Sequence, residues 1–249
     1  MSGHSHWAKV KRAKSANDAR RGKEWSKLAR RIIVAAKSGG GKPEENLSLR
    51  YAIDDAKAAN MPNDTIDKAI KKGTGELGAE NYELVVYEGY GPGGVAFMVE
   101  CLTNNRNRTA PEMRKIFERH NGQLGSTNCV AWMFQQKGTF VVAASAAGED
   151  ALMELAMEFG ADDVTTEDDV FQITCPPAAF GKVKAALVGR NIPTVSAQIA
   201  MIPTSTIPLA GDAAASVLAL MESLEEHEDV QNVYANFDIP AEVIDKLVK

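Results

Sequence analysis

The side chains that could do chemistry in this sequence are mainly cations, and they are concentrated at its amino-terminal end. The first 37 residues contain eleven Lys or Arg and only two acids. Each of these cations could neutralise a phosphate, and Trp7 could stack on a base or ribose. The candidate nucleic-acid contacts in this segment are His4, His6, Trp7, Lys9, Lys11, Arg12, Lys14, Arg20, Arg21, Lys23, Lys27, Arg30 and Arg31. This composition is typical of a segment that binds a nucleic-acid backbone.

The charge of the chain is divided between two parts. Residues 1–75 hold 17 Lys or Arg and 8 Asp or Glu, a net charge of +9, whereas residues 76–249 hold 11 and 25, a net charge of −14. The two parts add up to the net charge of −5 for the 249-residue chain. Because the acidic part repels polyanions, binding is expected to be local to the basic part. A merely solvated basic face is the alternative, and the lack of balancing acids at i+4 positions disfavours it.

A second polar cluster, TNNRNRT at residues 103–109, stands between a predicted strand and a predicted helix. Its candidate binding residues are Asn105, Arg106, Asn107 and Arg108. Forked donors beside a helix N-terminus suit a phosphate or a carboxylate. The alternative is a polar turn in which Thr109 caps the helix. Neither cluster matches a zinc-finger, basic-zipper or RNA-recognition motif, so DNA and RNA both remain open as targets.

Residues that could carry catalysis are few. The chain has four His and three Cys, namely Cys101, Cys129 and Cys175, without an HExxH, a GxSxG or a Cys–His pairing of recognisable spacing. We therefore predict no enzymatic activity, no cofactor and no metal site. A square-planar copper or nickel site at Ser2-Gly3-His4, after removal of Met1, is a less favoured hypothesis. The unpaired cysteines and the lack of a long apolar run indicate a reducing compartment and no membrane partner.

The pattern of apolar residues predicts the elements that position these side chains. Amphipathic helices are expected from residue 15 to a stop at Gly39–Gly41, over 44–59, and from 63 to a stop at Gly73. Two strands around a type II turn follow in residues 82–103, and VAWMF at 130–134 is expected to be a strand. Residues 137–202 read as βαββαβ, the ferredoxin-like order, and the last helix and strand would complete the earlier sheet.

The predicted fold class is α+β, with an amino-terminal helical bundle and two α/β domains. The third domain is ferredoxin-like and inserted into the second. The predicted domains are residues 1–78, residues 79–136 together with 203–249, and the inserted residues 137–202. Two acidic stretches, residues 149–169 and 212–245, each hold nine acids without Lys or Arg and are interpreted as solvated faces.

Four stretches of the sequence resemble the YebC family, whose members include a mitochondrial translational activator. They are GHSHWAKVKRAKSANDARRGKEWSKLARRIIVAAKSGGG, AIDDAKAANMPNDTIDKAIKKGTGE, YEGYGPGGVAFMVECLTNNRNRT and VAWMFQQKG. The resemblance starts at Gly3, which implies that the basic segment belongs to the mature domain rather than to a transit peptide. It therefore implies a cytoplasmic protein. The family usually has lysine where this chain has His6, so one contact of the segment would depend on pH or be weaker.

The resemblance implies a three-domain protein that binds DNA and regulates transcription. Members of the family have also been tied to translation, on ribosomes stalled at proline-rich sequence. We therefore expect a DNA-binding regulator. The alternative is an RNA-binding, ribosome-associated factor that contacts rRNA or tRNA by shape and phosphate. The oligomeric state is left open.

Overall fold

The computed structural model describes residues 18–78, 81–167, 169–240 and 243. These residues group into two compact units. One unit contains the described residues of Val10–Cys129 and Asp212–Val233, and the other contains those of Val130–Gly211 and Tyr234–Lys249. The overall class is mixed α and β, as predicted. The division into three domains with the boundaries given above stays a prediction, since this grouping joins the helical segment to the first sheet.

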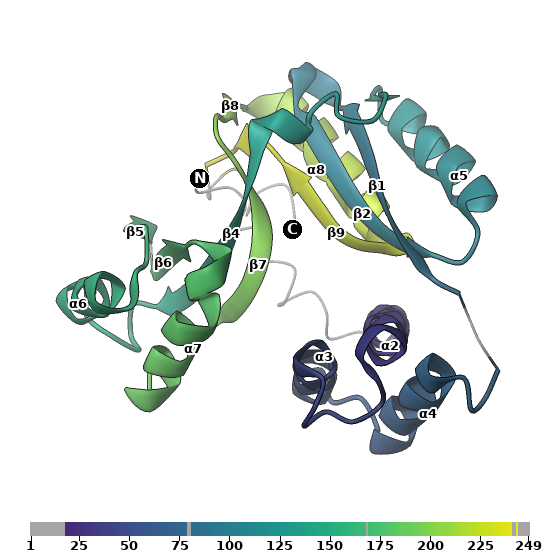
Figure 1. Ribbon diagram of the computed structural model, residues 1–249. Helices are drawn as coiled ribbons and strands as arrows, with labels where there is room; N and C mark the ends of the chain where they lie inside the picture. Colours follow the sequence, from purple (N-terminus) through teal and green to yellow (C-terminus); the bar gives the residue numbers. More distant parts are fainter. Residues whose placement is uncertain (1–17, 79–80, 168, 241–242, 244–249) are drawn as a thin grey trace. The chain divides into compact units, whose positions relative to one another are not determined.

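Three helices form the amino-terminal bundle of the first unit (Figure 1). They are α2 (Asp18–Gly39), α3 (Leu47–Ala58) and α4 (Asn63–Thr74). The buried side chains of this bundle are Leu28, Ile32, Ile33, Ala36, Leu49, Ala52, Ile53, Ala56, Met61, Ile66 and Ala69. Trp25 packs against them, and its indole N–H donates to the Ala59 carbonyl at 3.0 Å. The predicted apolar face of the first helix is therefore confirmed, and the cations of α2 whose side chains are described lie outside this buried face.

The second helix begins three residues later than predicted. Asn46 precedes α3, and its side chain accepts a hydrogen bond from the Leu49 backbone N–H at 3.0 Å. This cap fixes the start of the helix at Leu47 instead of Glu44. Leu47, the first residue of this helix, is 52% exposed.

Gly73 lies inside α4 and does not end it. The helix continues to Thr74, and Gly75 follows in the left-handed region with φ of +88°. A Cβ atom at Gly73 would lie 2.6 Å from the Cβ of Ala36, because α4 crosses α2 at this point. Glycine is needed here because the two helices approach closely. A sequence pattern cannot distinguish a glycine with this role from a glycine that ends a helix.

A four-stranded sheet with the order β3-β1-β2-β9 forms the rest of the first unit. Its strands are β1 (Glu83–Tyr90), β2 (Ala96–Thr103), β3 (Gln123–Leu124) and β9 (Val230–Ala235). Strand β1 pairs antiparallel with β2 and with β3. The position of β9 beside β2 confirms that the carboxy-terminal helix and strand complete this sheet.

Helices α5 (Arg106–Arg119) and α8 (Gly211–Glu226) accompany this sheet. The ring of Phe97 on β2 meets that of Phe117 on α5 edge to face, with centroids 6.0 Å apart. A Cβ at Gly91 would clash with Phe97 and with Leu220 of α8, so both helices reach the same region of the core. The turn between β1 and β2 is type II, as predicted. Gly93 has φ of 70° and ψ of 10°, and the Gly94 N–H donates to the Gly91 carbonyl.

Two predictions about this region were wrong. Asn105 rather than Thr109 caps α5, since the Asn105 side chain accepts from the Arg108 backbone N–H at 3.2 Å. VAWMF is not a strand throughout: Ala131–Met133 form a 3-10 turn in which the Met133 N–H donates to the Val130 carbonyl. Only the final Phe134 begins a strand, and Trp132 is 71% exposed.

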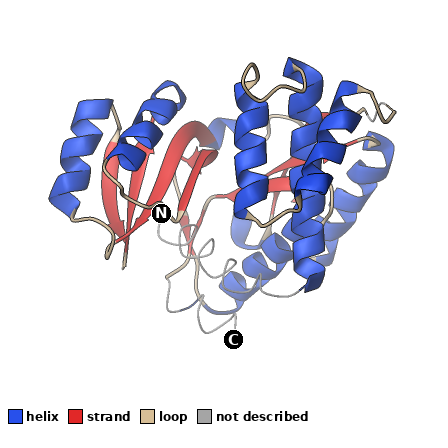
Figure 2. Cartoon of the chain, turned by 90° about the horizontal axis from the view of Figure 1, so that it is seen from below, coloured by secondary structure: helices blue, strands red, loops and turns tan. Residues whose placement is uncertain are grey.

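The second unit contains the βαββαβ order that the sequence predicted. Its elements are β4 (Phe134–Ala143), α6 (Glu149–Phe159), β5 (Asp163–Glu167), β6 (Val170–Cys175), α7 (Phe180–Gly189) and β7 (Ser196–Pro203). The strand order is β5-β6-β4-β7 with antiparallel neighbours, which is the ferredoxin-like arrangement. The helices gather on one side of this sheet (Figure 2). Phe140 and Phe180 stack in its core with centroids 4.9 Å apart.

A small parallel pair of strands was not foreseen. Strands β8 (Ile207–Pro208) and β10 (Phe237–Asp238) pair through the Ile207 N–H, which donates to the Asn236 carbonyl at 2.7 Å. Across the described residues, no helix has the length and apolar character that a membrane span requires.

Candidate nucleic-acid interface

Many of the predicted contacts of the basic segment cannot be placed. His4, His6, Trp7, Lys9, Lys11, Arg12 and Lys14 lie outside the described residues, and so does Ser2-Gly3-His4. Arg20 and Arg21 belong to the first turn of α2, where only the backbone is described. The described members of the set are therefore Lys23, Lys27, Arg30 and Arg31 on α2, and Asn105, Arg106, Asn107 and Arg108 at the start of α5.

Lys23 and Arg31 are the members of α2 that remain open to solvent. Arg31 lies 3.5 Å from Asp55 of α3, and both side chains are largely exposed. An exposed ion pair of this kind contributes less than about 1 kcal/mol, so it does not prevent Arg31 from meeting a phosphate. These two side chains have the accessibility that backbone binding requires.

Lys27 and Arg30 instead bind the last turn of α8 and the segment that joins it to β9. The Lys27 ammonium donates to the Glu225 carbonyl at 2.6 Å, at the carboxy-terminal end of α8, where a cation is favoured by the helix dipole. The Arg30 guanidinium donates to the carbonyl of Glu228 and lies 3.1 Å from its carboxylate. Its side chain is only 12% exposed. Arg30 also lies over the ring of Tyr82, 5.7 Å from the centroid.

Arg30 of the basic segment and Arg108 of the second polar cluster both contact the carboxylate of Asp229. Asp229 has a side chain that is 1% exposed, and its Oδ2 accepts from Arg108 Nη2 at 2.8 Å and from the Thr109 hydroxyl at 2.7 Å. The other oxygen, Oδ1, has no hydrogen-bond partner but lies 3.4 Å from Arg30 Nη1. The forked donors that we expected to bind a phosphate or a carboxylate thus hold a carboxylate of the same chain.

The charge of Asp229 is maintained although the group is buried. Burial opposes ionisation of this carboxyl, but the hydrogen bonds from Arg108 and Thr109 and the charges of Arg108 and Arg30 outweigh it and lower its pKa. Its backbone is fixed as well, since the Asp229 carbonyl accepts from the Leu102 N–H at 2.8 Å. The network therefore connects α2, α5, β2 and the start of β9.

The remaining residues of the second cluster have different roles. Asn105 is the cap of α5, and its own N–H donates to the Thr103 hydroxyl at 2.9 Å. Arg106 is exposed and lies 3.7 Å from Glu83, while Asn107 is exposed. The cluster is thus both a helix cap and a binding site for an internal anion, which combines the two interpretations of the sequence.

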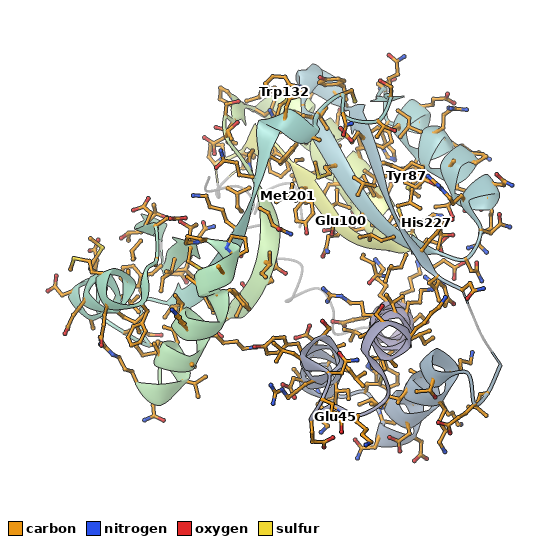
Figure 3. The ribbon with its side chains drawn as sticks, in the orientation of Figure 1. Glu45, Tyr87, Glu100, Trp132, Met201 and His227 are labelled. Carbon is orange, nitrogen blue, oxygen red and sulfur yellow. The ribbon has the colours of Figure 1, made fainter. Side chains whose placement is uncertain are left out.

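One group of possible metal ligands exists among the described residues, and its geometry is that of an ion-pair network. Glu112, His227 and Asp229 each offer a ligand atom within 4.8 Å of the others. His227, which lies at the end of the first sheet (Figure 3), directs Nε2 at the Glu112 carboxylate, 2.9 Å away. Its Nδ1 accepts from the Asp229 N–H at 3.1 Å. With both ring nitrogens engaged and guanidinium groups on Asp229, a cation is disfavoured here.

Two protein-family models match most of the chain. The model of the TACO1/YebC protein N-terminal domain matches residues 5–76, and that of the TACO1/YebC second and third domain matches residues 82–237. The chain belongs to the TACO1/YebC family. The resemblance found in the sequence is therefore confirmed.

Other members of the TACO1/YebC family match along their whole length. A protein of Pelotomaculum thermopropionicum named "Probable transcriptional regulatory protein" is 55% identical over 241 residues, covering 96% of this chain and 99% of its own. A protein of Geobacter sulfurreducens with the same description is 51% identical over all of both chains. The crystal structure of a conserved hypothetical protein from Aquifex aeolicus matches with a TM-score of 0.81 and 48% identity, covering 90% of this chain and 92% of that one.

Asp229 and its neighbours Glu228 and His227 were missed by the sequence analysis. They stand in an acidic stretch that was interpreted as a solvated face, about 120 residues from Arg108 and about 200 from Arg30. No local spacing relates them, because β9 is brought to β2 only by the sheet. The available signal was the position of Asp229 directly before the apolar Val230 of the last strand, because a carboxylate that enters the core there needs a cationic partner.

Proposed function

We propose that this chain is a non-enzymatic regulator of gene expression that binds the phosphate backbone of nucleic acid with its basic amino-terminal segment. The relatives that match along their whole length are named "Probable transcriptional regulatory protein", and this name supports the regulatory part of the proposal. The observation that carries the nucleic-acid part is the orientation of α2. Its apolar face is buried in the bundle, and Lys23 and Arg31 are exposed on its other faces, where they are open to a phosphate.

The proposal assigns direct contact with phosphate to only part of the residues predicted from the sequence. Lys27, Arg30 and Arg108 already have protein acceptors, so the proposal gives them a positioning role. Phosphate contact is assigned to the segment from His4 to Lys23, together with Arg31. Such Lys and Arg contacts fix register on a duplex without reading bases, so we expect weak sequence preference.

A ribosome-associated translation factor is the alternative function. Contact through phosphates and shape, without side chains arranged to read base edges, suits structured RNA as well as DNA. In that case the physiological partner would be rRNA or tRNA. We expect a cytoplasmic location in either case, because both partners are found there.

Neutralising part of the basic segment tests the proposal. The variant Lys9→Gln/Lys11→Gln/Arg12→Gln should bind a DNA duplex and an RNA duplex more weakly than the native chain. The matched control Lys182→Gln/Lys184→Gln/Arg190→Gln removes the same charge from α7 and the residue that follows it, and should bind as the native chain does. If the segment engages about six phosphates, the logarithm of affinity should fall with the logarithm of salt concentration with a slope of about −5. Native affinity in the amino-terminal variant would refute the proposal.

Two further measurements separate transcription from translation. Affinity for promoter duplexes should exceed affinity for random duplexes if the chain is a transcriptional regulator. Sedimentation of lysates through sucrose gradients should place the chain with ribosomes if it is a translation factor. Equal affinity for both kinds of DNA, together with ribosome co-sedimentation, would reject the regulator of transcription and retain the alternative.

A further inference from the structure

Helix α5 is a basic element within the acidic part of the chain. Five of the eleven Lys or Arg of residues 76–249 lie in its fourteen residues, beside only two acids. These cations are Arg106, Arg108, Arg114, Lys115 and Arg119. The part of the chain that was expected to repel polyanions therefore carries one helix with a net charge of +3.

The cations in the second half of α5 point away from the protein. Thr109, Met113 and Phe117 form the buried side of the helix. Arg114, Lys115 and Arg119 are exposed on the other side, and no ion pair connects them to any residue that the structure describes. Figure 1 shows α5 at the margin of its sheet, with its outer side uncovered by the other elements of the same unit. These three residues are called the α5 outer face below.

A solvated helix face does not account well for this arrangement. Exposed helices gain stability from opposite charges one turn apart, and like charges at that spacing cost a similar amount. Lys115 and Arg119 are like charges at i, i+4, and Glu118, which stands at i+4 from Arg114 and i+3 from Lys115, has no ion pair with any of the three. The repulsion is retained in a chain that has 33 acids available, which suggests that the positive charge itself is used.

The chemistry of the α5 outer face favours a phosphate backbone over a protein surface. Protein interfaces have an apolar or aromatic centre. The large apolar side chains that are exposed in the described chain include none from α5. Two of the three cations are arginines, whose planar groups donate two parallel hydrogen bonds to a phosphate. A polyanion would also remove the repulsion between Lys115 and Arg119.

We propose that the α5 outer face is a second nucleic-acid contact, which binds phosphodiester groups through Arg114, Lys115 and Arg119. This inference rests on the proposed function, because it names a further surface for the same partner. It differs in location, since it lies in the acidic part of the chain. Two separate contacts on one chain would raise the apparent affinity for a long duplex above that of either contact alone.

The test is the variant Arg114→Gln/Lys115→Gln/Arg119→Gln of the full chain, with binding to 30-base-pair DNA and RNA duplexes measured by fluorescence anisotropy. Loss of three contacts should make the salt slope for DNA shallower by about 2.7. The ratio of variant to native Kd should therefore decrease about 40-fold between 50 and 200 mM salt. The α7 control described above should keep the native slope. The variant should melt no lower than the native chain, since a like-charge pair is removed.

The outcomes distinguish this inference from the proposed function. Native slope and affinity in the α5 variant, with loss of binding in the amino-terminal variant, would overturn the inference and leave the function intact. Native binding by both variants would overturn both. Loss in the α5 variant alone would support the inference and refute the amino-terminal contact. If polyglutamate competes as well as DNA at equal charge, the face binds acidic protein and the inference is wrong.

Discussion

Replacing Asp229 by asparagine tests whether one buried carboxylate holds the helical bundle, α5 and the first sheet together. The amide keeps the shape of the side chain but removes the charge that faces Arg108 and Arg30. A hydrogen bond to a charged group contributes about 1.5–3 kcal/mol, and removing one partner of a buried ion pair costs about 3–5 kcal/mol. Arg108 is 40% exposed and can be hydrated in the variant, which lowers the cost. We expect a loss of about 2–3 kcal/mol and a fall in Tm of about 4–12 °C.

The effect should depend on pH in a defined direction. The pKa of Asp229 is lowered in the folded protein from its ordinary value of 3.8, because the hydrogen bonds and nearby arginines outweigh its burial. The stability that this group contributes is therefore fully present above that value and is lost as the pH falls through the lower, folded pKa. The difference in stability between native chain and variant should be largest at neutral pH and should shrink as the solution becomes strongly acidic.

Hydrogen exchange gives a local measurement of this effect. The amide of Leu102 donates to the Asp229 carbonyl, so peptides containing Leu102 report opening of this unit separately from the other. Glu226→Gln is the matched control, since it removes the same charge from an exposed side chain three residues away. Equal exchange at Leu102 in native chain and Asp229→Asn, or a loss of the same size in Glu226→Gln, would refute the reasoning.

Two further predictions concern packing and cysteine reactivity. Gly73→Ala should lower the free energy of unfolding by about 1–3 kcal/mol, because the new Cβ would lie 2.6 Å from that of Ala36. Gly22→Ala should raise the free energy of unfolding by about 0.5–1 kcal/mol, because nothing lies within 4 Å of the new Cβ. Urea unfolding of both variants checks the opposite signs, and equal signs would contradict the packing argument. Burial raises the pKa of the Cys101 thiol to about 12, and burial and then Glu88 raise the pKa of Cys129, which is partly exposed. Iodoacetamide at pH 8 should therefore label Cys129 slowly and Cys101 only after unfolding, as measured by mass spectrometry. Labelling of both cysteines at one rate in the folded protein would show that Cys101 is accessible and would contradict this prediction.

The order of elements could be predicted because each has a local pattern. The apolar face of α2, the type II turn at Gly93 and the βαββαβ order of the second unit all depend on residues within a few turns or strands of one another. The errors arose where two explanations give the same pattern. Gly73 could end a helix or permit a close approach, and Thr109 or Asn105 could cap the same helix. Tertiary contacts decide between them, as when Asp229 binds the Thr109 hydroxyl.

The candidate site was less accessible to sequence reasoning than the fold. Composition alone indicated a cationic surface, but it counted Arg30 and Arg108 as free when each has an internal carboxylate partner. It also stopped at Arg108 and omitted the exposed cations farther along α5. The charge of a segment does not reveal which of its side chains are neutralised by residues that are remote in sequence.

The location of β9 has a consequence for how the protein is made. Strand β2 is translated more than a hundred residues before β9, so the edge of β2 has no partner while the intervening ferredoxin-like sheet is synthesised. An open edge invites pairing with other chains, and contacts this distant in sequence form slowly. During that interval Arg30 and Arg108 also lack the aspartate that later neutralises them. A chain released before Asp229 would keep both defects, so synthesis of Asp229 and the carboxy-terminal strand completes and protects the first unit.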